Sequence, residues 1–291
     1  FEDTNVLIDK AISNINRKRT RGGDEPTTEF VNNSSLTFSG NSGAGTSTYV
    51  DTDFNPDDHS LNEGFTISYW VRADEVGTQM FAIGRRDSGG DERFDFGIDK
   101  PWQIHIGTGG TKLTGRWDNG LNDNPGGTAA ELFPDLFDDG ELHGTFKSLK
   151  TGNWLHFVVT YAGHSASPRT RIVYLNGKLI RTQNTVWSQT GDDPGGLIFG
   201  GRRTGGVGYN NGWSCGLDEV AIFDEEKDSN WVSSAYNSGT PTDLQNESGL
   251  VGYWRFEEGT GTTVADLSGN GNHGTLTTDD TGLPDWSTDT P

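Results

Sequence analysis

The feature that most constrains the fold of this chain is a series of short segments in which every second residue is apolar. The segment 65–74, FTISYWVRAD, shows this pattern in Phe65, Ile67, Tyr69 and Val71. A period of two places alternate side chains on one face of a β-strand, whereas an amphipathic helix has a period of about 3.6. The segments RFDFGID and NWLHFVVTYAG repeat the alternation. The sequence therefore predicts strands that each bury one face.

Turn-forming residues separate these predicted strands. In the segment RIVYLNGKLI, Asn176 and Gly177 lie between two apolar arms, and Asn-Gly favours a two-residue type I′ hairpin turn. The chain also holds 42 Gly, and clusters of Asn, Asp and Ser stand between the other apolar runs. Helical periodicity is scarce after the first 30 residues. We therefore predict an all-β fold, an antiparallel jelly-roll sandwich.

The first 30 residues follow a different pattern. The basic run RKRTR and the segment GGDEP follow a set of apolar residues. These apolar residues fall at helical spacing: Val6, Leu7, Ile8, Ala11, Ile12 and Ile15. We predict a short helical arm over residues 1–30, which packs on its own domain or docks on another subunit or a larger assembly. The sandwich is predicted over residues 31–245, followed by a C-terminal segment over residues 246–291.

The charge of the chain limits its partners. It carries 42 acidic and 22 basic residues, which gives a formal net charge of -20. Such a charge disfavours nucleic acids and anionic membranes and favours solubility or divalent cations. No apolar run is long enough to cross a bilayer. The single cysteine, Cys215, cannot form an intramolecular disulfide. We therefore predict neither a nucleic-acid partner nor membrane insertion.

Several segments, taken in order, resemble one protein family. They are SLTFSG with STYVDT, then FTISYWVRAD, then NWLHFVVTYAG with RIVYLNGKLI, then LIFGGR and GLDEVAIFDEE. In this order they resemble the concanavalin A-like, laminin-G-like jelly-roll domain, over most of residues 35–240. The resemblance implies a two-sheet sandwich of a kind used for binding.

The C-terminal segment GYWRFEEGTGTTVADLSGNGNHGTL, residues 252–276, resembles a motif that usually begins this domain. We favour an arrangement in which it completes the same sandwich, as in a circular permutation, because Tyr253, Trp254 and Phe256 would otherwise stay unburied. It could instead begin a second, truncated copy, or donate a strand to a neighbouring subunit and produce homo-oligomers. The C-terminal region also resembles structural proteins predicted in marine tailed phages.

One loop offers ligands for a hard cation. The sequence DLSGNGNHG places Asp266, Asn270 and Asn272 on a glycine-rich backbone, and carboxylate and amide oxygens suit Ca²⁺. The resemblance associates similar loops with calcium, and we expect Asp218 as a further ligand of a structural Ca²⁺. In the alternative interpretation, these Asn and Gly residues only form turns.

Candidate sugar-binding residues lie elsewhere. Aromatic side chains beside arginine commonly stack against sugars and hydrogen-bond to them, which makes Arg85, Trp102 and Trp117 candidates. Gln103 and His105 in the segment WQIH resemble the Gln-Ile-His element of alginate lyases, where the pair neutralises a uronate and assists proton abstraction. An arginine-rich strand and a Tyr-bearing partner motif, which such lyases also use, are not found. We therefore predict no catalytic residues.

These observations favour a non-enzymatic surface protein with a capacity for glycan adhesion. We predict a virion surface, decoration or fibre component, located on the virion or outside the cell. Its expected partners are a polysaccharide or a cell-surface glycan and, for a viral protein, capsid or tail proteins. The alternatives are a secreted carbohydrate-active enzyme, either a polysaccharide lyase or a glucanase, and a carbohydrate-binding module of a larger protein.

Overall fold

The chain divides into two units, Phe1–Val31 and Asn32–Pro291. The computed structural model describes residues 30–40, 48–75, 80–85, 94–100, 103–108, 119–120, 137–141, 147–163, 165–184, 196–204, 208–210, 212–278 and 282–291. The helical arm predicted for residues 1–30 therefore lies almost entirely outside the described residues. The two eight-stranded β-sheets of the structure both belong to the second unit.

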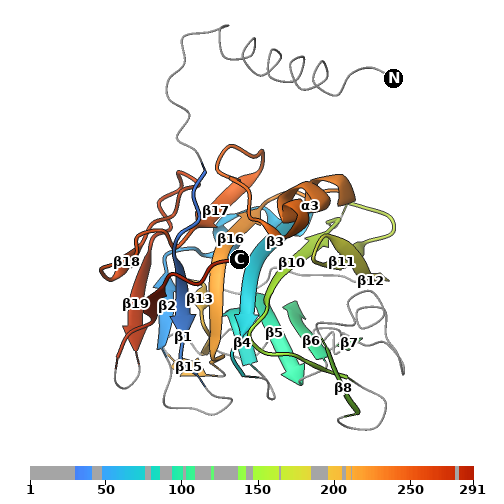
Figure 1. Cartoon of the computed structure of the whole chain (residues 1–291). Helices are drawn as coiled ribbons and strands as arrows, with labels where there is room; N and C mark the ends of the chain where they lie inside the picture. Colours follow the sequence, from blue (N-terminus) through green and yellow to red (C-terminus); the bar gives the residue numbers. More distant parts are fainter. Residues whose placement is uncertain are drawn as a thin grey trace, which may run out of the picture. The chain divides into compact units, whose positions relative to one another are not determined.

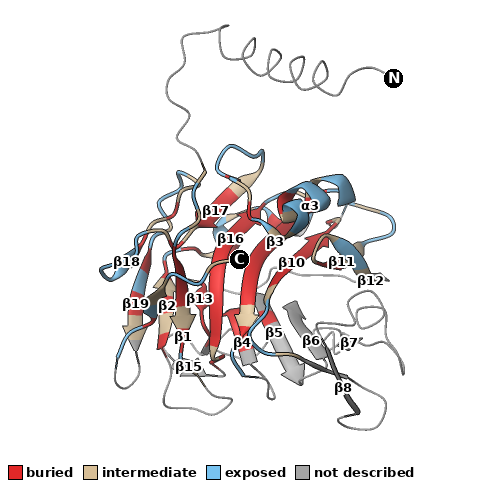
Figure 2. Cartoon of the chain, viewed as in Figure 1, coloured by how far each residue is buried: buried red, intermediate tan, exposed pale blue. Residues whose placement is uncertain are grey.

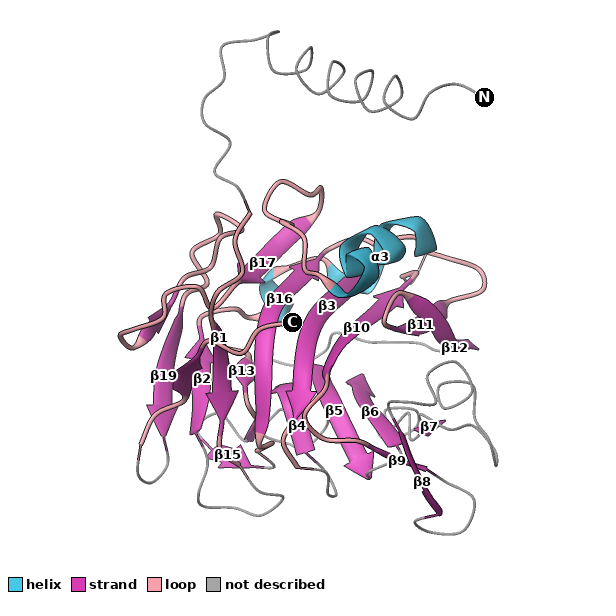
Figure 3. Cartoon of the chain, viewed as in Figure 1, coloured by secondary structure: helices cyan, strands magenta, loops and turns pink. Residues whose placement is uncertain are grey.

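Two antiparallel sheets make up the described part of the second unit (Figures 1 and 3). The first sheet has the order β12 (Lys178–Asn184), β11 (Thr170–Leu175), β10 (Trp154–Tyr161), β3 (Phe65–Ala73), β16 (Cys215–Phe223), β1 (Ser35–Phe38) and β20 (Asp285–Ser287), and β17 (Leu250–Trp254) also pairs with β16. The second has the order β18 (Thr263–Val264), β19 (Gly274–Thr278), β2 (Thr48–Thr52), β13 (Ile198–Phe199), β4 (Met80–Gly84), β5 (Phe94–Lys100), β6 (Gln103–Thr108) and β7 (Asn119–Gly120).

The smaller elements connect and flank these sheets. They are the hairpins β8 (Phe137–Glu141) with β9 (Lys147–Leu149) and β14 (Arg202–Thr204) with β15 (Gly208–Asn210), the helix α3 (Ser229–Tyr236), and the short 3₁₀ turns η1 (Pro56–Asp58), η2 (Leu61–Glu63) and η4 (Asn237–Gly239). Among the described residues, no helix has the length and apolarity that a membrane span requires.

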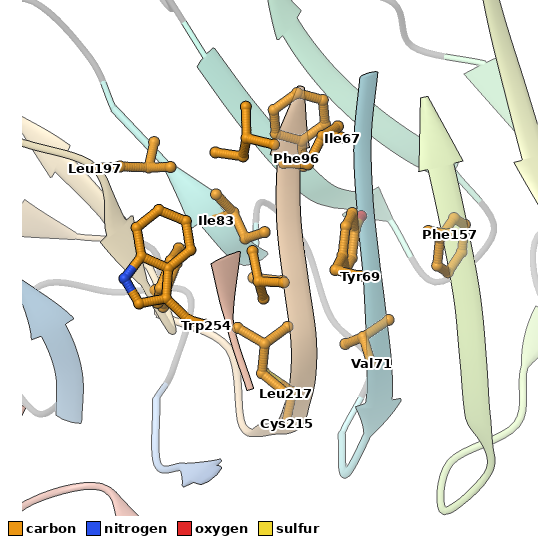
Figure 4. Close-up of a cluster of buried hydrophobic side chains, with 14 of the residues drawn as sticks. Ile67, Tyr69, Val71, Ile83, Phe96, Phe157, Leu197, Cys215, Leu217 and Trp254 are labelled. Carbon is orange, nitrogen blue, oxygen red and sulfur yellow. The ribbon is translucent and has the colours of Figure 1, made fainter. Parts of the chain in front are cut away.

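Apolar side chains from both sheets fill the interior between them (Figure 4). The central strands β3, β10 and β16 are buried along most of their length (Figure 2). The alternating residues predicted for β3 all point into this core. On β10 the predicted alternating residues do the same: Leu155, Phe157, Val159 and Tyr161. The second sheet contributes Val50, Ile83, Phe96 and Phe199. The period-two pattern therefore identified the buried face of the central strands correctly, because alternate residues of a strand share one face.

The hairpin between β11 and β12 also has the predicted turn. Asn176 and Gly177 have φ values of 48° and 74°. A type I′ turn needs positive φ at both central residues, and this requirement explains the Asn-Gly sequence. A side chain at Gly177 would come within 2.9 Å of the ring of Tyr236, so this position also lacks room. The turn is therefore fixed by backbone conformation and by packing.

The helix α3 covers part of the outer face of the first sheet, the face turned away from the core. Val232 packs with Val158 and Tyr174, while Ala235 joins a cluster with Ala221 and Tyr253. Asp228 caps the helix by accepting a hydrogen bond from the Trp231 backbone N–H, and Asn237 ends it in a left-handed conformation. This covering explains why outward-facing positions such as Val158 of β10 and Ala221 of β16 are apolar.

Aromatic rings continue the cover where α3 ends. Tyr236 stacks near Trp70 and His156, whose ring centroids lie 5.8 and 6.0 Å from its own. The Ser68 hydroxyl lies 2.8 Å from Nε2 of His156. Burial lowers the pKa of His156 to about 3, so this imidazole stays neutral at physiological pH. Ser68 and His156 therefore form a buried polar pair within the sheet.

Strand β16 joins segments from distant parts of the chain. It pairs with β3 along one edge, and with β1 and then β17 along the other. A bulge interrupts its pairing with β3 between Asp218 and Ala221, and Glu219 within the bulge has φ 48°. Near this bulge, Oε1 of Glu257 accepts hydrogen bonds from the backbone amides of Asn33 and Ser34, at 2.8 and 3.1 Å.

Candidate functional site

The predicted sugar-binding residues are only partly placed. Arg85 follows β4 and is 1% exposed. Gln103 and His105 lie two positions apart on β6, in register with Lys100 and Gly97 of β5. Trp102 and Trp117, and the side chains of Gln103 and His105, lie outside what the structure describes. The predicted sugar-binding set therefore stays a prediction.

The loop predicted to bind calcium is closed by its own hydrogen bonds around Asp266. One carboxylate oxygen, Oδ1, accepts from the backbone amides of Tyr253 and Ser268, at 3.0 and 2.9 Å. The other, Oδ2, accepts from the Ser268 hydroxyl and from the Asn272 amide, both at 2.9 Å. The carboxylate is buried, so these donors replace the water that it loses on folding. Asp266 thus ties the loop to β17.

The two asparagines of this loop bind the same backbone atom. The side-chain amides of Asn270 and Asn272 donate to the carbonyl oxygen of Val251, at 3.0 and 3.1 Å. The carbonyl of Asn272 in turn accepts from the indole N–H of Trp254 at 2.9 Å. The asparagines therefore do more than form turns, because both side chains also fix the loop on β17.

Asp218 has different contacts from the predicted loop ligands. It is fully buried on β16, and its Oδ1 accepts from the Glu219 amide at 2.9 Å. No hydrogen bond of the described residues joins it to Asp266, Asn270 or Asn272. Among the same residues, no group of three or more His, Cys, Asp or Glu side chains is arranged to hold a metal ion. A cation at Asp266 would have to compete with the protein donors already there, and the calcium site stays a prediction.

Next to Asp218, the buried carboxylate of Glu219 is held by two partners. Tyr253 donates its hydroxyl hydrogen bond to Oε2, and Nε of Arg255 donates to Oε1 at 3.0 Å. Burial raises the pKa of Glu219 to about 7, although Arg255 acts in the opposite direction. Burial also raises the pKa of Asp218, and the neighbouring charge of Glu219 adds to that rise. Asp218 and Glu219 are therefore neighbouring buried acids whose raised pKa values favour the protonated form.

The raised pKa of Glu219 predicts that the stability of the folded chain depends on pH. Since the pKa of Glu219 rises from 4.5 to about 7 on folding, the folded chain binds a proton that the unfolded chain releases in this interval. The contribution of Glu219 is therefore fully present below pH 4.5 and is lost as the pH rises to 7, a change of about 3 kcal/mol. Glu219→Gln should remove this part of the slope in urea titrations between pH 4.5 and 7. The exposed control Asp285→Asn should leave the slope unchanged, and an unchanged slope in Glu219→Gln would contradict the assignment.

The sequence did not single out a polar and aromatic group on the outer face of the first sheet. Arg72 on β3 and Trp154 on β10 are register partners, with the guanidinium carbon 5.5 Å from the indole centroid. Asp74 accepts from Nε and Nη2 of Arg72 at 2.7 and 3.0 Å, and Asp289 accepts from Nη1. Arg72 and Asp74 lie only two positions apart in the sequence, but their partners Trp154 and Asp289 come from segments far along the chain.

A family comparison decides the class of the protein. Residues 42–233 match the family model Laminin_G_3, described as the concanavalin A-like lectin/glucanases superfamily. The chain belongs to the concanavalin A-like superfamily. The membership agrees with the two antiparallel sheets described above, and the fold class inferred from alternation and turns is confirmed. A search of the curated proteins finds no match.

Solved structures with this concanavalin A-like fold share little sequence with the chain. A candidate carbohydrate-binding protein from Bacteroides ovatus aligns with a TM-score of 0.56 and 13% identity, covering 88% of this chain and 62% of its own. The chain thus spans less than two thirds of that protein. A heptameric SAP-like pentraxin from Limulus polyphemus aligns with a TM-score of 0.46 and 14% identity, covering 86% of this chain and 93% of its own. At 13% identity, the likeness to the Bacteroides ovatus protein is one of fold alone.

Proposed function

We propose that this protein binds glycans without catalysing a reaction. The main support is the match of residues 42–233 to a superfamily whose description names lectins. The large negative charge of the chain is compatible with sugar ligands, which do not need a basic surface. Because the fold alone does not determine a function, the proposal depends on a direct binding measurement.

The acidic residues near β16 support a role without catalysis. A glycosidase of the usual type needs two carboxyl groups on either side of a bound sugar. The carboxylate of Asp218 is 0% exposed and that of Glu219 is 2% exposed, and Glu219 is occupied by Tyr253 and Arg255. These two acids therefore cannot flank a sugar without a large rearrangement.

We place this glycan-binding function on the surface of a virion or outside a cell, as a decoration or fibre component. The resemblance of the C-terminal region to marine tailed-phage structural proteins motivates the virion assignment. Capsid or tail proteins would then be its partners, and the surface would present several copies of the chain. Size measurement of the purified chain by light scattering tests the homo-oligomer, and a monomer at all concentrations would contradict it.

A second candidate function is polysaccharide cleavage, because the superfamily description also names glucanases. Gln103 and His105 lie two positions apart on β6. If these residues act on a uronate polymer, the protein should release unsaturated products, and Gln103→Ala should abolish that release. The non-catalytic proposal expects no products at all.

The decisive experiment is binding to an array of marine and bacterial polysaccharides. The purified chain is applied once with Ca²⁺ and once with EDTA, and released products are analysed by mass spectrometry. We expect binding without products. Loss of binding in EDTA would support a Ca²⁺ ion at Asp266, Asn270 and Asn272. Cleavage would overturn the non-catalytic assignment, and absence of binding to every polysaccharide would overturn glycan binding itself.

A further inference from the structure

One part of the outer face of the first sheet carries an aromatic and charged group beyond the end of α3. The cover described above ends with Tyr236, which stacks on Trp70 and His156. Arg72 lies two residues after Trp70 on β3, and Trp154 lies two residues before His156 on β10. Arg72 and Trp154 are register partners. Unlike the alternating residues of the core, these two side chains belong to the outward face of their strands. Both are only partly buried.

The absence of a side chain at Gly216 lets the Trp154 indole lie close to the sheet. Gly216 of β16 pairs with Arg72 of β3, the strand that lies between β16 and β10. A Cβ atom at Gly216 would lie 2.9 Å from Cη2 of Trp154, closer than real contacts allow. The indole therefore reaches from β10 across β3 towards β16, with its benzene edge over the glycine.

The Arg72 guanidinium, whose carbon lies over this ring at 5.5 Å from the centroid, is held by two carboxylates. Asp74 binds Arg72 through two parallel hydrogen bonds, and Asp289 of the C-terminal segment binds a third N–H. The side chains of Asp74 and Asp289 are 31% and 58% exposed, so they also face solvent. Bidentate pairing fixes the plane of an arginine, which limits the entropy that a ligand would have to remove. The group is thus ordered before any ligand arrives.

We propose that Trp154, Arg72, Asp74 and Asp289 form a binding site for a neutral saccharide, which we call the outer-face patch. This inference rests on the proposed glycan-binding function and names the residues that carry it. The apolar C–H face of a pyranose ring would stack on the indole, and its hydroxyl groups would donate to the two carboxylates. One arginine and two aspartates give the patch a net negative charge, which disfavours uronate and sialate ligands.

The test measures saccharide affinity in matched variants. Neutral β-glucan and galactan hexasaccharides and an anionic alginate hexasaccharide are titrated into the full chain by isothermal calorimetry. Trp154→Ala should weaken binding of a neutral hexasaccharide by about tenfold, as expected for the loss of a stacking contact. Asp289→Asn should weaken it severalfold. Asp285→Asn, a change at another exposed aspartate four residues away on β20, should have no effect.

Each outcome decides a different point. Binding of a neutral hexasaccharide that Trp154→Ala and Asp289→Asn leave unchanged would overturn the outer-face patch while preserving the proposed function. Binding of alginate alone would overturn the neutral-sugar assignment. No binding of any hexasaccharide by the wild-type chain would overturn the outer-face patch, and the polysaccharide array would then decide the proposed function. If Trp154→Ala does not fold, NMR of the wild-type protein replaces this variant. The outer-face patch then requires that the indole N–H signal of Trp154 shifts when a neutral hexasaccharide binds.

Discussion

Replacing Trp254 with alanine should lower the free energy of unfolding by about 4 kcal/mol, because the change opens a large cavity in the core. Trp254 is fully buried, and its ring meets Phe54 and Phe199 edge-on, with centroid distances of 5.8 and 5.0 Å. Its indole N–H also binds the Asn272 carbonyl, so truncation would leave that carbonyl with one partner fewer. The loss therefore combines packing with a hydrogen bond between β17 and the Asp266 loop.

Chemical denaturation followed by far-UV circular dichroism measures this effect. Trp231→Ala provides the matched control, since Trp231 is only partly buried on α3 and binds Glu247 at the surface. We expect a smaller loss for the control, about 1 kcal/mol. A loss at Trp254 no larger than that at Trp231 would mean that β17 is not an integral part of the core.

Replacing Asp266 with alanine should cost about 3 kcal/mol, because four donors lose their acceptor at once. The donors are the amides of Tyr253, Ser268 and Asn272 and the hydroxyl of Ser268. Tyr253 is fully buried, so its amide has no water to replace the lost bond. Asp266→Asn keeps an oxygen acceptor and should cost less than Asp266→Ala.

Thermal unfolding of the two Asp266 variants in Ca²⁺ and in EDTA separates two roles for this residue. If Asp266 acts through its protein donors, each variant should lose as much stability in EDTA as it loses in Ca²⁺. If a bound ion carries the effect, wild-type stability should fall in EDTA and the variants should respond less. A stability of Asp266→Ala equal to wild type in both conditions would contradict either role.

The sequence contained enough to predict the sandwich because its strands carry a local signal. Alternation in β3 and β10 specified which residues face the core, and Asn176-Gly177 specified the hairpin between β11 and β12. Burial of Tyr253, Trp254 and Phe256 also followed, since such rings rarely remain exposed together. Each of these features depends on residues that are close in the chain.

The candidate sites were harder to predict because they depend on pairing between distant segments. Asp218 was predicted as a calcium ligand from its chemistry alone, whereas its burial beside Glu219 at the bulge of β16 depends on how the strands pair. The contact of Arg72 with Asp289 joins positions 217 residues apart. Composition and spacing do not contain such juxtapositions; only the strand order of the sheet creates them.

The position of β16 has a consequence for how the protein is made. Its neighbours β1 and β3 leave the ribosome long before it does, and the amides of Asn33 and Ser34 meet Glu257 from more than 220 residues away. Until β16 is synthesised, the edge of β3 lacks its partner and remains open to pairing with other chains. Closing such distant contacts is slow. The nascent protein should therefore depend on chaperones until β16 and β17 have emerged, and synthesis that stops before β16 should yield aggregates.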